Sequence, residues 1–129
     1  MESCTNPASV IGSSTSLPNV QATEANNKIT INIDSASPLA AVGNAVLVNF
    51  QSGSVLVDHL SSETYNALSS ICTHQDCLIT NFDSASNEFV CTCHGSRFDI
   101  NGKVTQGPAN SSLQKYSTQF VNNQLIINI

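Results

Sequence analysis

The sequence has no tryptophan, few charged residues and no long apolar run. Charged residues make up only 10% of the 129 positions, and the formal net charge is −5. A negative chain is poorly suited to nucleic acid or to an anionic membrane surface, so neither is expected as a partner. Because no apolar run reaches the length of about 18 residues that a spanning helix needs, we expect no transmembrane helix. The first residues also lack the charged and apolar regions of a signal peptide.

Residues that favour strands and turns are abundant. The chain is rich in Ser, Asn, Thr, Val and Ile, and no segment has a convincing helical pattern. Apolar and polar residues alternate over residues 29–33, as in a half-buried strand. Turn sequences that predict hairpins occur at Gln51-Ser52-Gly53, Asn101-Gly102 and Asn122-Asn123. The sequence therefore predicts one all-β domain, an antiparallel sandwich or barrel.

The N-terminal part of the chain differs in composition from the rest. Residues 1–27 are rich in Ser, Thr, Asn and Ala, so we expect a flexible tether there and the folded domain over residues 28–129. Cys4 is either an exposed thiol or the lipid-modified cysteine of a mature lipoprotein. Asp58 and His59 are expected in a turn that continues through residues 61–63, with His59 on the surface.

Two short boxes, residues 72–77 and 91–99, contain four of the five cysteines and two of the three histidines. Each box pairs a cysteine with a nearby histidine and adds one further cysteine. Two loops that each supply a thiolate and an imidazole suit a site for two metal ions. One iron of a 2Fe–2S cluster would take Cys72 and Cys91, and the other would take His74 and His94.

Structural zinc is the alternative use of such residues. A zinc site normally draws two cysteines from a single turn with C-x2-4-C spacing, so that both bind one ion. Here Cys77 lies five residues beyond Cys72, and two thiols are surplus to a Cys2His2 set. A zinc-stapled β-module for protein binding therefore remains the candidate from another functional class.

The two boxes resemble the cluster-binding boxes of Rieske iron–sulfur proteins, in particular the high-potential branch of cytochrome bc and bf complexes. That branch has C-T-H-x-x-C followed by C-x-C-H-G-S, and the resemblance extends from Cys72 to Pro108, where the family has its proline loop. It implies a β base with a cluster-binding subdomain, about residues 71–108, at one tip. It also implies a disulfide between Cys77 and Cys93, which ferredoxins of oxygenase systems lack. A stable disulfide favours a compartment outside the cytoplasm.

The resemblance also gives roles to residues around the cluster. Ser96 would donate a hydroxyl hydrogen bond to a bridging sulfide and raise the reduction potential. Phe98 stands where high-potential members often have a tyrosine that bonds a ligand sulfur, so one hydrogen bond is missing. Gly95 would permit close approach of the backbone to the cluster. Pro108, with Gly107, would shield one side of it.

These features predict a one-electron carrier rather than an enzyme with its own turnover. It would be periplasmic or on the outer face of the membrane, as a carrier or subunit of a quinol–cytochrome chain, attached only through a missing anchor or a lipidated Cys4. A cytochrome or membrane oxidoreductase is the expected partner, and quinol is a further candidate. Gln75-Asp76 replaces the Leu-Gly of quinol-oxidising members, which argues against direct quinol oxidation. The alternative within electron transfer is a Rieske ferredoxin that serves an oxygenase.

Overall fold

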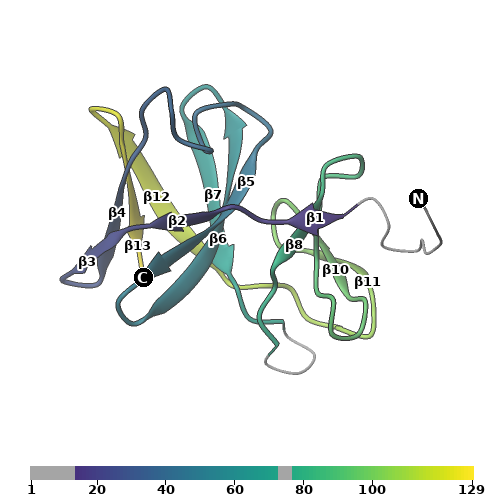
Figure 1. Ribbon diagram of the computed structural model, residues 1–129. Helices are drawn as coiled ribbons and strands as arrows, with labels where there is room; N and C mark the ends of the chain where they lie inside the picture. Colours follow the sequence, from purple (N-terminus) through teal and green to yellow (C-terminus); the bar gives the residue numbers. More distant parts are fainter. Residues whose placement is uncertain (1–13, 73–76) are drawn as a thin grey trace.

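The computed structural model of the chain describes residues 14–72 and 77–129. Within these two ranges, all regular secondary structure is β-strand (Figure 1). The strands form two sheets, so the all-β prediction is confirmed. Over these two ranges, no helix has the length and apolar character needed to cross a bilayer. Four residues singled out in the sequence lie outside the described residues: Cys4, His74, Gln75 and Asp76.

The large sheet has eight strands in the order β2-β5-β6-β7-β12-β13-β4-β3. Its strands, in chain order, are β2 (Asn19–Gln21), β3 (Thr23–Ala25), β4 (Lys28–Asn32), β5 (Ala45–Phe50), β6 (Gly53–Ser61), β7 (Thr64–Ser69), β12 (Lys115–Val121) and β13 (Gln124–Asn128). The predicted hairpins β5–β6 and β12–β13 are both present. Asn122 and Asn123 form the second turn with positive φ, which asparagine tolerates better than most residues.

The large sheet nearly closes into a barrel. Its two edge strands, β2 and β3, are consecutive in the chain and are separated only by Ala22. The Ala22 N–H donates to the Asn49 carbonyl at 2.9 Å. One short segment therefore lies along both edges, with β3 antiparallel to β4 and β2 parallel to β5. The parallel pair is the one departure from the antiparallel arrangement that the sequence predicted.

The small sheet has five strands in the order β1-β8-β9-β10-β11. Its strands are β1 (Thr15–Ser16), β8 (Asn81–Asp83), β9 (Glu88–Val90), β10 (Arg97–Asp99) and β11 (Val104–Gln106). The first box precedes β8, and the second runs from the end of β9 through β10. This sheet overlaps the region, about residues 71–108, that is expected to bind the cluster, and it includes β1 from the N-terminal segment.

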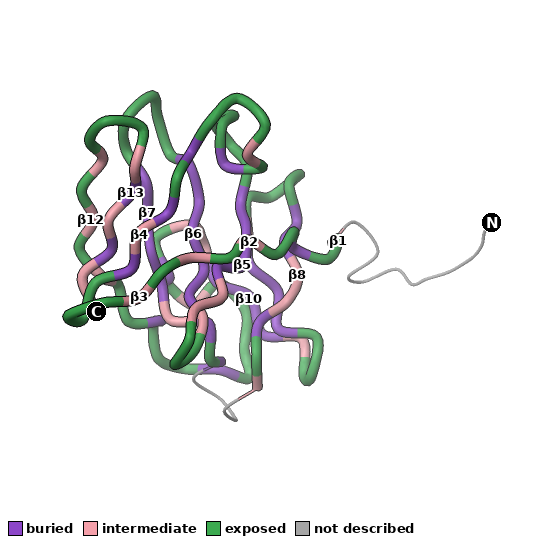
Figure 2. Tube along the Cα trace, turned by 60° about the vertical axis from the view of Figure 1, so that its left-hand side comes forward, coloured by how far each residue is buried: buried purple, intermediate pink, exposed green. Residues whose placement is uncertain are grey.

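Two separate apolar cores result from this arrangement. One core, which includes Ile29, Val57 and Leu125, is formed by the large sheet together with the segment between β4 and β5, which contributes Leu39. The other contains residues of both sheets, among them Leu56 and Phe89. Strand β6 contributes to both cores, so its residues from Val55 to His59 are all buried, as the colouring of Figure 2 shows along β6.

Two predictions about local structure were wrong. Residues 15–25 are not a free tether, because β1 pairs with β8, β2 with β5 and β3 with β4. Leu17, between β1 and β2, is buried in the core that both sheets share. The folded unit therefore includes Thr15 rather than starting at Lys28.

The turn expected at Asp58 and His59 is instead strand, because β6 continues to Ser61. His59 is buried rather than on the surface. Its ring stacks on Tyr65 at a centroid distance of 4.1 Å, and its Nδ1 lies 2.8 Å from the Leu39 carbonyl oxygen. These contacts give His59 a packing role in the large sheet.

Candidate metal centre

Backbone hydrogen bonds close the base of the first box. Ile71 and Leu78 form an isolated antiparallel bridge on either side of it. The Cys72 N–H donates to the Cys77 carbonyl at 2.8 Å, and the Ile79 N–H donates to Ser70 at the same distance. Cys72 and Cys77 are therefore held opposite each other at the start and the end of the box.

The first part of the second box, residues 91–96, is a tight turn between β9 and β10. The Cys91 N–H donates to the Ser96 carbonyl at 2.8 Å, and the Gly95 N–H donates back to the Cys91 carbonyl at 2.9 Å. Gly95 has φ +85°, a conformation that glycine adopts without strain. A Cβ at this position would meet nothing nearer than Gln106 Nε2 at 3.9 Å, so the turn requires the backbone conformation of glycine rather than its small size.

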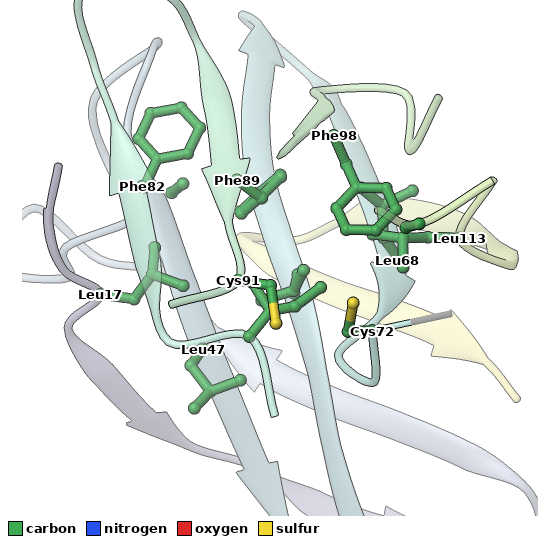
Figure 3. Packing of buried hydrophobic residues seen from close by; sticks show 13 residues of the cluster. Leu17, Leu47, Leu68, Cys72, Phe82, Phe89, Cys91, Phe98 and Leu113 are labelled. Carbon is green, nitrogen blue, oxygen red and sulfur yellow. The ribbon is translucent and has the colours of Figure 1, made fainter. Parts of the chain in front are cut away.

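The four box cysteines divide into two pairs. Cys77 and Cys93 form a disulfide that links the two boxes, as the resemblance implied. Cys72 and Cys91 are free thiols, both buried in the core between the sheets. Figure 3 shows them on separate chain segments at one edge of that core. The sulfurs of Cys77, Cys91 and Cys93 all lie within 4.8 Å of one another, so the disulfide is beside the free thiol of Cys91.

The surroundings of Cys91 act in opposite directions on its ionisation. Burial raises the pKa of the Cys91 thiol, and the Cys72 thiol raises it further through a hydrogen bond and through charge. The backbone N–H groups of Cys93 and His94 oppose this rise because they stabilise a thiolate. Two adjacent buried thiols ionise together only when positive charge compensates them, and metal ions supply such charge.

His94 is exposed, in contrast to the buried cysteines. Of the two predicted histidine ligands it is the one among the described residues, and it lies at the surface of the second box. An imidazole there can meet both solvent and a partner protein while a buried thiol three residues earlier faces the core. The structure thus places the candidate sulfur ligands, Cys72 and Cys91, in the interior and the candidate nitrogen ligand His94 at the surface.

Ser96 connects the second box to the segment around Pro108. Its side chain is fully buried, and its Oγ accepts a hydrogen bond from the Ala109 N–H at 3.0 Å. Because this bond uses a lone pair, the hydroxyl proton can be donated elsewhere. The Gly107–Pro108 peptide bond is cis and Pro108 is exposed. Its shielding role stays a prediction.

Phe98 is fully buried in the same core as Cys72 and Cys91. Figure 3 shows its ring on the side of this core nearer to Cys72. The position is therefore inside the structure that surrounds the candidate ligands, as the resemblance implied. A hydrogen bond to sulfur is not available to the phenyl ring.

A buried ion-pair network in the small sheet was missed by sequence reasoning. Arg97, on β10, pairs with Asp83 on β8 at 3.1 Å and with Glu88 on β9 at 3.0 Å. Glu88 also accepts a hydrogen bond from Thr105 on β11 at 2.5 Å. These contacts join four strands of the small sheet, and one of those strands, β10, is the last part of the second box. The only signal in the sequence was an arginine next to Ser96.

Burial opposes ionisation of Glu88, but the hydrogen bonds from Thr105, Arg97 and Ser86 outweigh it and lower the pKa of this carboxyl group. For Arg97, burial disfavours the charged form, yet bonds to Asp83 and Glu88 leave its pKa raised. Glu88 and Arg97 are therefore both ionised at neutral pH.

Comparison with known families identifies the chain. Residues 30–117, well over half of its length, match the sequence profile described as the Rieske [2Fe-2S] domain. The chain belongs to the Rieske family. The cofactor of this domain is a 2Fe–2S cluster, as expected from the boxes, and the residues fit it: two buried unbridged thiols and an exposed imidazole come from two loops joined by a disulfide. Membership of this family argues against the alternative prediction of a zinc-stapled β-module.

Curated relatives resemble this Rieske chain over part of their length. The cytochrome b6-f complex iron-sulfur subunit 1 of Nostoc sp. strain PCC 7120 is 33% identical over 89 residues, which are 67% of this chain and 49% of the relative. The cytochrome b6-f complex iron-sulfur subunit of Prochlorococcus marinus strain AS9601 is 54% identical over 46 residues, which are 36% of this chain and 25% of that relative. The chain thus spans between a quarter and a half of these relatives.

Solved Rieske structures share the fold. The cyanobacterial plasma membrane Rieske protein from Synechocystis PCC 6803 has a TM-score of 0.63 and 34% identity, with 77% of this chain and 99% of that chain covered. The ferredoxin of carbazole 1,9a-dioxygenase from Nocardioides aromaticivorans IC177 has a TM-score of 0.57 but only 19% identity. The match covers 76% of this chain and 95% of that chain. The second likeness is one of fold alone.

Proposed function

We propose that this Rieske domain transfers single electrons through a 2Fe–2S cluster bound by Cys72, His74, Cys91 and His94. The observation that carries the proposal is the division of the cysteines. The disulfide takes Cys77 and Cys93, and it leaves one buried free thiol in each box. Each of those thiols is accompanied by a histidine in the same box.

The residues of this chain prepare and tune such a site. When bound, a cluster with two imidazole ligands accepts and releases one electron at about −150 to +300 mV. Burial keeps Cys72 and Cys91 away from water and from oxidants, while His94 is exposed to solvent. Because a deprotonated imidazole favours the oxidised state, the reduction potential should fall as pH rises through the imidazole pKa values.

A membrane complex outside the cytoplasm is the setting that agrees best with these features. The curated relatives are named as subunits of the cytochrome b6-f complex, and a solved neighbour is a plasma membrane Rieske protein. The disulfide favours an oxidising compartment. A cytochrome would then receive the electron, and attachment would be through lipidated Cys4 or a separate anchor. Asp76, beside His74, favours a protein donor over direct quinol oxidation.

Metal and sulfide analysis tests the proposal. We expect two iron atoms and two inorganic sulfides per chain, with visible absorption, after anaerobic purification. Cys72→Ser and Cys91→Ser should each lose the cluster, whereas Cys4→Ser is the matched control and should keep it. A colourless protein that contains zinc and no sulfide would overturn the proposal.

A Rieske ferredoxin of an oxygenase system is the second candidate, supported by fold likeness to such a ferredoxin. The Cys77–Cys93 disulfide favours the first candidate, because the resemblance places this pair in the high-potential branch. Voltammetry across pH separates the two. A potential near the lower end of the Rieske range, with no pH dependence from neutral to strongly alkaline pH, would favour the ferredoxin.

A further inference from the structure

The pairing between β10 and β11 contains a β-bulge at the end of the second box. Arg97 pairs with Gln106, whereas Phe98 pairs with Val104, so the register shifts between these two pairs. Thr105 is the extra residue, and in a regular ladder it would stand opposite Arg97. A bulge changes the direction of the side chains beside it. Here it decides which residue of β11 lies next to the second box.

Both residues that oppose Arg97 at the bulge make a side-chain contact with a neighbouring element. The Thr105 hydroxyl donates to the Glu88 carboxylate on β9. The Gln106 Nε2 donates to the Gly95 carbonyl at 3.0 Å. The bulge therefore gives β11 one contact with the ion-pair network and one with the turn of the second box.

The contact from Gln106 is made to a group that the backbone bonds of the turn do not use. Those two bonds join the Cys91 N–H to the Ser96 carbonyl and the Gly95 N–H to the Cys91 carbonyl. The Gly95 carbonyl accepts instead from the side chain of Gln106. A Cβ placed on Gly95 would lie 3.9 Å from the same amide nitrogen, so the amide is next to the backbone of this residue. Gln106 thus holds the turn from a neighbouring strand.

The turn carries His94, the candidate ligand that directly precedes Gly95. His94 is exposed, so its position depends more on the backbone that carries it than on packing against the core. Three residues after Gln106, the Ala109 N–H donates to the Ser96 hydroxyl. The end of β11 and the segment after it therefore bond to two consecutive residues of the second box.

We propose that Gln106 is a positioning residue for the 2Fe–2S cluster: its amide holds the Gly95 carbonyl and thereby fixes the segment that carries His94. This inference rests on the proposed function, in which His94 binds iron. Metal ligands are oriented by hydrogen bonds from groups that do not touch the metal themselves. The backbone transmits the effect here, because the bond is made to the residue next to the ligand.

Three variants of the cluster-loaded protein test this role. Gln106→Met removes the donor and keeps a side chain of similar length, whereas Gln106→Lys keeps a donor of similar reach. Gln119→Met makes the first change at an exposed position on β12 of the large sheet, and it is the matched control. Gln106 is exposed, and a single hydrogen bond contributes little to stability. We therefore expect all three variants to unfold at nearly the same urea concentration as the unaltered protein.

Electron paramagnetic resonance of the reduced cluster reports the geometry at the histidine ligands. In Gln106→Met we expect shifted g values and a change in one of the two imidazole-nitrogen couplings, because the lost bond is to the box of His94. Gln106→Lys should give a spectrum close to that of the unaltered protein, and Gln119→Met an identical one. Loss of iron to a chelator should be about two- to tenfold faster in Gln106→Met, which is the equivalent in rate of one hydrogen bond.

An unchanged spectrum in Gln106→Met would overturn the proposal. Equal changes in Gln106→Met and Gln106→Lys would also overturn it, because the donor would then be irrelevant. A large fall in the urea midpoint of Gln106→Met would show a structural role instead and would have the same consequence.

The unaltered protein separates this inference from the proposed function. If the unaltered protein contains no iron and no inorganic sulfide, both fail. If it contains the cluster and Gln106→Met has the same spectrum, only the role of Gln106 fails.

Discussion

The Ala109 N–H donates to Ser96 Oγ at 3.0 Å, and this bond ties the segment after Pro108 to the second box. Ser96 is fully buried and Ala109 nearly so. One hydroxyl group therefore accepts a bond from a neighbouring loop and keeps its own proton free to donate. If it donates to the cluster, as the family resemblance implies, we expect the position of this loop to affect the redox potential.

Ser96→Ala should lower both stability and reduction potential. The Ala109 N–H would lose its acceptor inside the protein, at a cost of about 1–3 kcal/mol in unfolding free energy. The reduction potential should also fall. A hydrogen-bond donor stabilises the more negative reduced cluster more than the oxidised cluster, so its removal destabilises the reduced state more. Voltammetry and denaturant unfolding measure the two effects, and Ser61→Ala, at the exposed end of β6, should change neither.

Phe98→Tyr should raise the reduction potential by an amount on the order of tens of millivolts, because the new hydroxyl can donate to a ligand sulfur. Phe98 lies in the same buried core as the Cys72 and Cys91 thiols, so the added hydroxyl would also lie in that core. Phe120→Tyr, on β12 of the large sheet, is the control and should leave the potential unchanged. An unaltered potential in Phe98→Tyr would show that the ring edge faces away from the sulfurs.

Replacing both disulfide cysteines by serine should make the cluster short-lived. The disulfide links the two boxes across a sequence separation of 16 residues. Its loss should lower the unfolding free energy by about 2–4 kcal/mol and allow the loops to separate. Decay of visible absorption in air measures the lifetime, with Cys4→Ser as the control. Equal lifetimes in both variants would contradict a clamping role.

Asp58→Asn should make stability less dependent on pH. The folded protein holds the Asp58 proton until about pH 7, whereas the unfolded chain releases it near 3.8. Stability from this group is therefore complete below 3.8 and falls as pH rises to 7, by up to about 4 kcal/mol. Asp58→Asn should be the more stable protein at pH 8, and the two proteins should have similar stability near pH 4. Parallel curves for the two proteins would disprove the raised pKa.

Arg97→Gln should destabilise the small sheet by about 3 kcal/mol, because it removes the cation that faces Asp83 and Glu88. The lowered pKa of Glu88 adds a pH effect: its contribution is present above the unfolded pKa and is lost as pH falls through the folded value. Chemical unfolding at several pH values measures both. Lys103→Gln, at an exposed position, should have little effect.

The sequence predicted the features that depend on short local patterns. Asn122-Asn123 marked a hairpin because asparagine tolerates positive φ, and the two boxes named the cysteines that the structure joins or leaves free. The resemblance supplied the pairing of Cys77 with Cys93, which spacing alone leaves open. It also assigned Phe98 a place near the candidate ligands; the structure buries Phe98 in the core that contains Cys72 and Cys91, and its effect on the potential stays a prediction.

Features that depend on distant partners were not predictable in this way. Strands β1 to β3 have only two or three residues each and gain stability from the strands beside them, so their Ser- and Asn-rich sequence resembled a tether. His59 follows Asp58 in a strand buried on both faces, where polarity does not alternate. Arg97 finds its two carboxylates on other strands, which no local pattern reveals.

The segment from Thr15 to Ala25 runs along both halves of the molecule, as Figure 1 shows for β1, β2 and β3. Its first pairing, Thr15 with Phe82, is at the edge of the small sheet. A pulling force applied to the chain at Ser14 would consequently reach the small sheet before the large sheet. Such a force would detach β1 from the edge of the small sheet, and the resistance would come from the pairing of Thr15 and Ser16 with β8 and from the Leu17 N–H bond to the Thr80 carbonyl.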